Sequence, residues 1–155
     1  MREKRKKYLL DENLGKLAKW LRVLGFDAAI YKSISPEKKI DLCLKEQRVY
    51  LTRSKKLSAR KEKFTRILIK SDNCDQQLRE LGLAVELDEN LFFTRCINCN
   101  KILKLIDENK VINLVPKDVH KKFTEFKTCT KCGRIYWAGS HYQAMFTKIK
   151  NSLTS

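Results

Sequence analysis

The stretch Arg95-Cys-Ile-Asn-Cys-Asn100, answered by Cys129-Thr-Lys-Cys132, decides how the C-terminal part of this chain folds. Each stretch is a Cys-x-x-Cys turn that presents two sulfur ligands, and two such turns complete the tetrahedron that zinc prefers. The 29 residues between the two pairs exceed the usual spacing, but closing a longer loop costs little additional entropy. We therefore expect one structural zinc ion, with two disulfides or four unrelated thiols as alternatives. The predicted ligands are Cys96, Cys99, Cys129 and Cys132.

Charge is the strongest feature of the composition. The 155 residues include 34 Lys and Arg against 18 Asp and Glu, a net charge of +16. Residues 1–91 carry 22 basic and 14 acidic side chains and residues 92–155 carry 12 and 4, so each part contributes +8. An excess spread in this way indicates a polyanionic partner, most simply nucleic acid. The alternative is a basic protein that is merely kept soluble by its charge.

The apolar and cysteine patterns bear on the compartment. No run approaches the roughly 20 apolar residues of a membrane span, and no long apolar run follows the basic N-terminus, as a secretory signal would require. Cysteines used as paired ligands suit a reducing environment. The sequence therefore predicts an intracellular, cytoplasmic protein that does not enter a membrane.

Strand-like and helix-like segments alternate before residue 92. Strands are expected at residues 8–10, 26–32, 49–51 and 67–69, after a flexible basic arm at residues 2–7. Three helices are expected: one after Asp11, one from Ser35-Pro36, and one at about residues 74–81. Ile40, Cys43 and Leu44 would form the buried face of the second helix. This rhythm predicts a parallel three-layer α/β domain over residues 1–91.

Residues 92–155 are expected to form a small zinc ribbon with a terminal helix. The two cysteine turns, a strand at residues 111–115, a second strand at residues 134–137 and a helix from about Ser140 would make up this module. About sixty residues cannot build a large core, so the metal is expected to supply much of the stability.

Candidate site residues follow the expected strands. Function collects at the carboxyl ends of parallel strands, where Asp11, Arg53 with Ser54, and Asp72 would lie. Metal-dependent nucleases use several carboxylates at such an edge to hold Mg²⁺ or Mn²⁺. Asp11 is the strongest candidate, and its alternative role is to cap the helix that follows.

Two groups of basic side chains are candidates for phosphate contact. Lys16, Lys19 and Arg22 recur every three residues and would form a row along one helix. Residues 53–66 contain seven basic side chains in fourteen positions, and a solvated surface is the alternative to phosphate contact there. The seven are Arg53, Lys55, Lys56, Arg60, Lys61, Lys63 and Arg66.

Three longer stretches resemble one known family. They are Leu10-Asp-Glu-Asn-Leu-Gly-Lys-Leu-Ala-Lys-Trp-Leu-Arg-Val-Leu-Gly-Phe-Asp27, Arg48-Val-Tyr-Leu-Thr-Arg53, and the ribbon motif formed by Arg95-Cys-Ile-Asn-Cys-Asn100 with Cys129-Thr-Lys-Cys-Gly-Arg-Ile-Tyr-Trp-Ala-Gly-Ser-His141. In these stretches the chain resembles the PIN-like ribonucleases named after the C-terminal domain of the exonuclease Mut-7. The resemblance implies a PIN-like α/β domain, a C-terminal zinc ribbon, RNA as the partner, and RNA cleavage that needs Mg²⁺ or Mn²⁺. His141 belongs to this motif, and we expect it to serve local packing in preference to phosphate contact.

The chain departs from the family pattern at the acidic positions. Ser54 stands where the family usually has Asp, and Ser35-Pro36-Glu37 stands where it usually has an acidic pair. The catalytic candidates are therefore Asp11, Glu37 and, by a loose match, Asp72. We expect either a metal-dependent ribonuclease with a reduced site or a non-catalytic RNA-binding protein, associated with the ribosome or another ribonucleoprotein. A DNA-binding zinc-ribbon factor is the weaker third reading.

Overall fold

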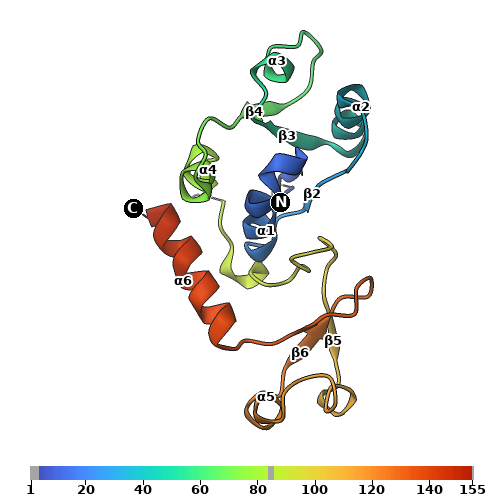
Figure 1. The fold of residues 1–155 in the computed structure, drawn as a ribbon, viewed down its shortest axis with the longest axis vertical. Coiled ribbons are helices and arrows are strands. Elements are labelled where there is room, and N and C mark those ends of the chain that lie inside the picture. Colours follow the sequence, from blue (N-terminus) through green and yellow to red (C-terminus); the bar gives the residue numbers. More distant parts are fainter. Residues whose placement is uncertain (1–3, 84–85, 155) are drawn as a thin grey trace.

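The computed structural model describes residues 4–83 and 86–154. Figure 1 shows an upper α/β part joined to a lower ribbon, with the last helix running back toward the upper part. The elements in chain order are β1 (Lys7–Leu10), the 3-10 helix η1 (Glu12–Leu14), α1 (Gly15–Val23), β2 (Ala28–Ala29), α2 (Pro36–Glu46), β3 (Arg48–Thr52), α3 (Lys55–Ser58), β4 (Arg66–Leu68), α4 (Cys74–Glu80), η3 (Glu89–Leu91), β5 (Lys104–Ile106), η4 (Glu108–Lys110), α5 (Lys117–Lys122), β6 (Phe126–Thr128), β7 (Ile135–Tyr136) and α6 (Ser140–Thr154).

The upper part is built on a parallel sheet with strand order β2-β1-β3-β4. Leu9 pairs with Tyr50, and both pack with Ile40 and Cys43 of α2 on one face of the sheet. Leu10 points to the opposite face, where the larger core forms against α1 and α4. Because neighbouring side chains of a strand point to opposite faces, a sheet covered on both faces needs apolar residues at every position. The predicted parallel α/β architecture is confirmed.

The terminal helix α6 packs against the upper part of the molecule. Its apolar side chains join the larger core, and α6 lies beside α4 (Figure 1). Arg79 donates to the Ser152 carbonyl at 2.6 Å, and the Ser152 hydroxyl donates to Asp75 at 2.6 Å. α6 thus connects the end of the ribbon to the α/β layers. The division of the chain into domains at residue 91 stays a prediction.

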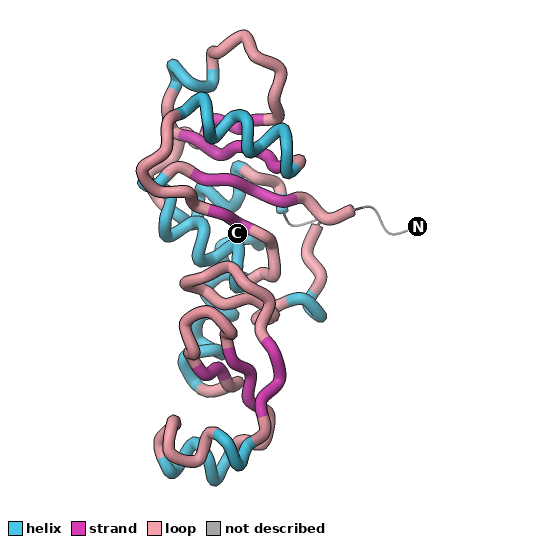
Figure 2. Tube along the Cα trace, turned by 90° about the vertical axis from the view of Figure 1, so that its right-hand side faces the viewer, coloured by secondary structure: helices cyan, strands magenta, loops and turns pink. Residues whose placement is uncertain are grey.

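The ribbon contains an antiparallel sheet with strand order β5-β6-β7, below the parallel strands in Figure 2. The predicted strand at residues 111–115 is wrong. The Leu114 N–H donates to the Val111 carbonyl at 2.8 Å, which closes a turn. Val111 and Val115 are both buried against Phe126 while Ile112 is exposed, so an apolar run that resembles a strand is in fact a compact turn between η4 and α5.

Several smaller expectations also change. The second strand is only Ala28–Ala29, and Leu44, expected to be buried, is 53% exposed. Residues 1–3 of the expected basic arm lie outside the described residues. The part that is described is anchored, since Arg5 donates to the Leu24 carbonyl at 3.1 Å and lies 3.9 Å above the Phe26 ring. No helix within residues 4–83 and 86–154 is long and apolar enough to cross a membrane.

Candidate functional site

The four predicted zinc ligands lie together. The sulfur atoms of Cys96, Cys99, Cys129 and Cys132 are all within 4.8 Å of one another, and those of Cys96 and Cys132 are 3.7 Å apart. Four sulfurs about 2.3 Å from a central zinc ion would be about 3.8 Å apart, whereas a disulfide bond is about 2.05 Å long. All four cysteines are free. The cluster therefore has the donor set and spacing to hold one zinc ion, and it contains no disulfide.

Both cysteine turns have the same backbone shape. Asn100 and Gly133, each directly after a second cysteine, have φ angles of +66° and +75°. Their N–H groups donate to the carbonyls of Cys96 and Cys129 at 2.9 and 2.8 Å. Asn and Gly tolerate this left-handed conformation better than other residues. Burial raises the pKa of the Cys96 thiol, but hydrogen bonds from Tyr136 and from backbone N–H groups outweigh it and lower this pKa, while burial and the neighbouring thiols raise the pKa of Cys99.

Arg22 connects the first cysteine turn to α1. Its guanidinium is buried and donates to the carbonyl of Ala28 at 2.9 Å, of Ile97 at 2.8 Å and of Asn98 at 3.2 Å. Sequence periodicity placed Arg22 in an exposed basic row with Lys16 and Lys19, which are both exposed. We therefore remove Arg22 from the candidate RNA contacts, because its charge satisfies backbone carbonyls inside the protein.

A second connection runs from Asn100 through Asp27 to Arg48. The Asn100 side chain accepts from the Ala28 N–H at 3.0 Å and donates to Asp27 at 2.7 Å. Arg48, only 9% exposed, forms ion pairs with Asp27 at 2.7 Å and Glu46 at 2.6 Å. This Asp27 network joins the first cysteine turn, the end of α2 and the start of β3.

Replacing Arg48 with Ala is expected to destabilise the protein by about 3 kcal/mol, because it leaves two carboxylates without their partner in a half-buried position. Burial raises the pKa of Asp27, but hydrogen bonds from Arg48 and Asn100 outweigh it and hold this pKa below its ordinary value. A depressed carboxyl pKa stabilises the fold above the unfolded-state pKa, near 4, and this contribution is lost as pH falls through the folded-state value.

Urea unfolding at pH 7 and at pH 3 measures both effects. The cost of Arg48→Ala should shrink at the lower pH, because protonated carboxyls no longer need the guanidinium. The same substitution at Arg53, Arg53→Ala, should lower the free energy of unfolding by less than 1 kcal/mol, because Arg53 is 35% exposed and pairs with Asp72. Equal costs for the two variants would contradict the role assigned to the Asp27 network.

The Asp11 carboxylate is held by three donors at the carboxyl end of the parallel sheet. It accepts from the Tyr50 hydroxyl at 2.5 Å and the Thr52 hydroxyl at 2.6 Å, and it pairs with the Lys39 ammonium at 3.1 Å. Burial and the bond to Asp11 raise the pKa of Tyr50, so this hydroxyl stays a donor. Asp11 occupies the N-cap position of η1, but its side chain makes no capping bond, so the capping alternative does not describe the side chain.

The other two carboxylate candidates are engaged elsewhere. Glu37 is exposed and pairs with Arg60 at 3.0 Å, while Asp72 is 89% exposed and pairs with Arg53. Across residues 4–83 and 86–154, the four cysteines are the one group of three or more Cys, His, Asp or Glu close enough to share a metal. Asp11, Glu37 and Asp72 are therefore not brought together as a ligand set.

Ser54 has a local structural role. Its hydroxyl accepts from the Leu57 N–H at 3.1 Å and caps α3, and its own N–H donates to the Thr52 hydroxyl at 3.1 Å.

Lys39 was missed by sequence reasoning. The signal available was its place in α2, which follows a strand and therefore begins at the edge of the sheet where Asp11 lies.

The basic candidates divide into paired and exposed groups. Arg60 lies between Glu37 and Glu62, and Arg53 pairs with Asp72, so much of their charge is compensated. Lys55 and Lys56 on α3, Lys61 after it, and Lys16 and Lys19 on α1 are exposed. In the part of the chain that is described, these five lysines form no ion pair. α3 follows β3, so the three lysines around it lie at the same edge of the sheet as Asp11.

Comparison with known proteins shows the family of the chain. No curated protein and no solved structure matches it. One family model, described as the Mut7-C RNAse domain, matches residues 6–149. This match spans β1, the Asp11 edge, both cysteine turns and most of α6, and the chain therefore belongs to the Mut7-C RNAse domain family.

Proposed function

We propose that this chain is an RNA-binding protein with a PIN-like fold, in which Lys39 supplies the positive charge that a divalent metal ion would supply at Asp11. The observation that carries the proposal is the 3.1 Å ion pair between Lys39 and Asp11, completed by the Tyr50 and Thr52 hydroxyls. A carboxylate offers about four lone-pair sites, and the three donors already use three of them.

The Asp11 site does not fit a catalytic Mg²⁺ or Mn²⁺ ion. An ion such as Mg²⁺ usually keeps several waters and is bound by one or two carboxylates together with substrate phosphates. Here one carboxylate is paired with an ammonium group, and Glu37 and Asp72 are bound to arginines. We therefore expect metal-dependent RNA hydrolysis to be weak or absent, and the family activity with a reduced site is the alternative.

The cysteine cluster is proposed as a structural zinc site. All four ligand positions are cysteines, so no coordination position stays open for water or substrate, as a catalytic zinc site requires. The ion would hold both cysteine turns in place, and through Asn100 and Arg22 it would fix the ribbon against the α/β layers.

RNA binding is proposed to use the exposed lysines at the Asp11 edge and on α1. Phosphates are attracted by uncompensated charge, and each lysine that contacts one releases a counterion. The family assignment favours RNA over DNA as the partner. The compensated arginines, Arg53 and Arg60, are expected to contribute less than Lys55, Lys56 and Lys61.

Replacing Lys55, Lys56 and Lys61 with Gln is expected to weaken binding of single-stranded RNA and to flatten its salt dependence. The slope of log K against log salt should fall in magnitude by about 2, since each lost phosphate contact removes about 0.7. Fluorescence anisotropy between 50 and 300 mM salt measures this slope.

The matched control replaces Lys45, Lys104 and Lys110, which are exposed and lie away from the Asp11 edge, and changes net charge equally. This control should leave the slope near its original value. Equal loss in both triple variants would show that overall charge, and not a local surface, governs RNA binding. Absence of RNA binding at low salt would refute the proposed function.

A further inference from the structure

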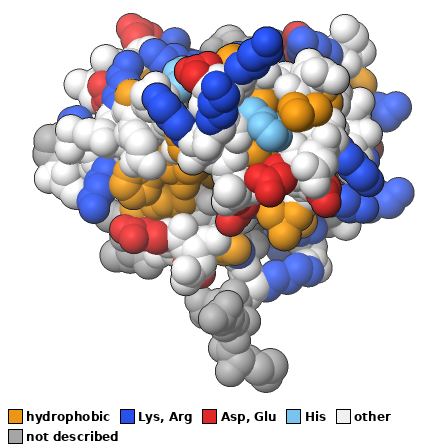
Figure 3. Space-filling model, turned by 90° about the horizontal axis from the view of Figure 1, so that it is seen from below, with side chains coloured by type: hydrophobic (Ala, Val, Ile, Leu, Met, Phe, Trp, Pro, Cys, Tyr) orange, Lys and Arg blue, Asp and Glu red, His pale blue; other side chains and the backbone are white. Residues whose placement is uncertain are grey.

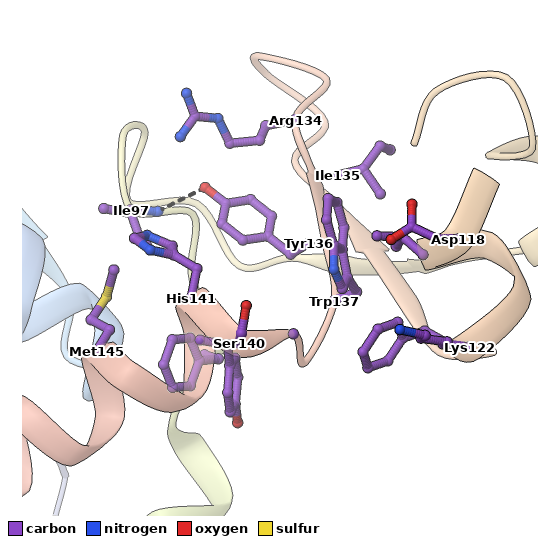
Figure 4. A pocket seen from close by; sticks show the side chains of 15 residues that line it. Ile97, Asp118, Lys122, Arg134, Ile135, Tyr136, Trp137, Ser140, His141 and Met145 are labelled. Carbon is purple, nitrogen blue, oxygen red and sulfur yellow. Dashed lines mark hydrogen bonds between the residues drawn. The ribbon is translucent and has the colours of Figure 1, made fainter. Parts of the chain in front are cut away.

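A cavity of about 490 Å³ lies between the ribbon, α5 and the start of α6 (Figure 4). This volume falls within the range of small-molecule sites, roughly 300–1,000 Å³. Its lining combines aromatic rings with charged side chains, and Figure 3, which views the molecule from below, shows apolar patches among basic and acidic side chains on that face. The residues on which the inference depends are Lys122, Arg134, Tyr136, Trp137 and Gly139.

We infer that this cavity binds an unpaired base of single-stranded RNA, stacked against the aromatic wall that contains Trp137. The inference rests on the proposed RNA-binding function and adds a site that is distinct from the lysines at the Asp11 edge. Stacking on an aromatic ring recognises the flat face that every base has, so it needs no particular sequence.

The aromatic wall is fixed before any ligand arrives. The Tyr136 hydroxyl accepts from the Ile97 N–H at 3.2 Å and lies 3.2 Å from the Cys96 sulfur, so this ring is held by the first cysteine turn (Figure 4). Trp137 packs near Phe126, with ring centroids 6.3 Å apart, while it also lines the cavity. A fixed ring loses little conformational entropy when a base stacks on it.

Gly139 allows the chain to pass close to Trp137. A Cβ atom at this position would lie 2.8 Å from the indole nitrogen, which is closer than real Cβ contacts permit. Any side chain at residue 139 would therefore displace the indole or the backbone. The close packing of Gly139 on Trp137 helps to explain how a half-buried indole keeps one place in the cavity wall.

The charges around the cavity suit a nucleotide. Arg134 and Lys122 are exposed, and with Asp118 as the one acidic side chain in the lining, the cavity carries a net positive charge. When the Asn98 amide is oriented with its oxygen toward Arg134, it accepts from the guanidinium at 3.2 and 3.3 Å, which holds Arg134 at the cavity. A phosphate beside the stacked base would find these cationic groups within the same lining.

The test compares two probes with the same number of phosphates, a uridine decamer and a decamer of abasic ribose phosphates. The unmodified full-length protein should bind the uridine decamer about tenfold more tightly, because only that probe can stack. Trp137→Ala should abolish this difference and leave the salt slope unchanged. Trp137→Phe, which keeps an aromatic face, should retain most of the difference, and Leu105→Ala, at an exposed apolar ribbon residue, should retain all of it.

Two measurements keep the inference testable if Trp137→Ala does not fold. Uridine decamer should quench the tryptophan fluorescence of the unmodified protein, since Trp20 is buried and Trp137 is half-buried, and the abasic decamer should not. Arg134→Gln should weaken binding of both decamers by a similar factor. Equal affinity for the two decamers would overturn the base-binding site but leave RNA binding intact, whereas no affinity for either would overturn the proposed function itself.

Discussion

Cys129→Ser is expected to release zinc and to unfold the ribbon, with a loss of free energy of unfolding of the order of 10 kcal/mol for this part of the chain. Zinc binding and folding are one event in small modules of this kind, and the apparent binding free energy is of that size. Elemental analysis should find one zinc ion per chain in the unmodified protein and none in the variant.

The size of this effect follows from how small the apolar core of the ribbon itself is. Its apolar residues form two small clusters, one around Cys96, Leu103 and Cys129 and one around Val111, Val115 and Phe126. The first of these clusters contains Cys96 and Cys129, with Cys99 packed against it, and so includes three of the four proposed zinc ligands. Loss of the ion would therefore remove the centre of that cluster as well as four bonds.

Cys43→Ser provides the matched control, because it makes the same chemical change at a buried cysteine outside the cluster. Burial raises the pKa of the Cys43 thiol to about 12, so this residue is a packing group without metal-binding character. The control should keep its zinc, with a modest loss of stability. Full zinc retention in Cys129→Ser would contradict the proposed ligand set.

Sequence reasoning recovered the elements whose signals are local. Ser35 and Pro36 begin α2 as expected, the Ser35 hydroxyl accepting from the Lys38 N–H, because capping depends on neighbouring residues only. The strands of the parallel sheet and the two Cys-x-x-Cys turns were also predicted from local signals, since each pattern is contained in a few consecutive residues.

Long-range contacts explain what was missed. Arg22 follows the spacing of an exposed row, yet the fold places carbonyls from residues 97 and 98 against it. Lys39 pairs with Asp11, 28 positions earlier in the chain. The spacing of residues along a helix does not specify which distant group each side chain will contact. Such partners are therefore known only from the assembled fold.

Lys39→Glu combined with Ser54→Asp is expected to create a divalent metal site at Asp11, where we propose that the unmodified protein has none. Lys39→Glu places a carboxylate at the position whose ammonium contacts Asp11. Residue 54 donates its N–H to Thr52, which itself contacts Asp11, and Ser54→Asp can still cap α3, because Asp is as good an N-cap as Ser. At Mn²⁺ concentrations of about 100 times the Kd, the ion should stabilise the double variant by about 2.7 kcal/mol. Thermal unfolding with and without Mn²⁺ should show no shift for the unmodified protein.

Lys38→Glu with Ser54→Asp is the matched control, since it changes net charge equally at the adjacent exposed position of α2. It should not respond to Mn²⁺, because it leaves the Lys39 ammonium on Asp11. If the acidic site is only weakened, the Lys39→Glu double variant should also cleave RNA with Mn²⁺, and Asp11→Asn should abolish that cleavage.

The unmodified protein is the decisive comparison for the role of Lys39. An ammonium group already neutralises Asp11, so Mn²⁺ should neither bind there nor promote cleavage, and Asp11→Asn, which leaves the Lys39 charge uncompensated, should not weaken RNA binding. Robust Mn²⁺-dependent cleavage by the unmodified protein, lost on Asp11→Asn, would mean that bound RNA draws Lys39 away and that another acid completes the site. Asp72 would then be the first residue to replace, because its partner Arg53 is itself a candidate phosphate contact, and a phosphate that bound Arg53 would release the carboxylate.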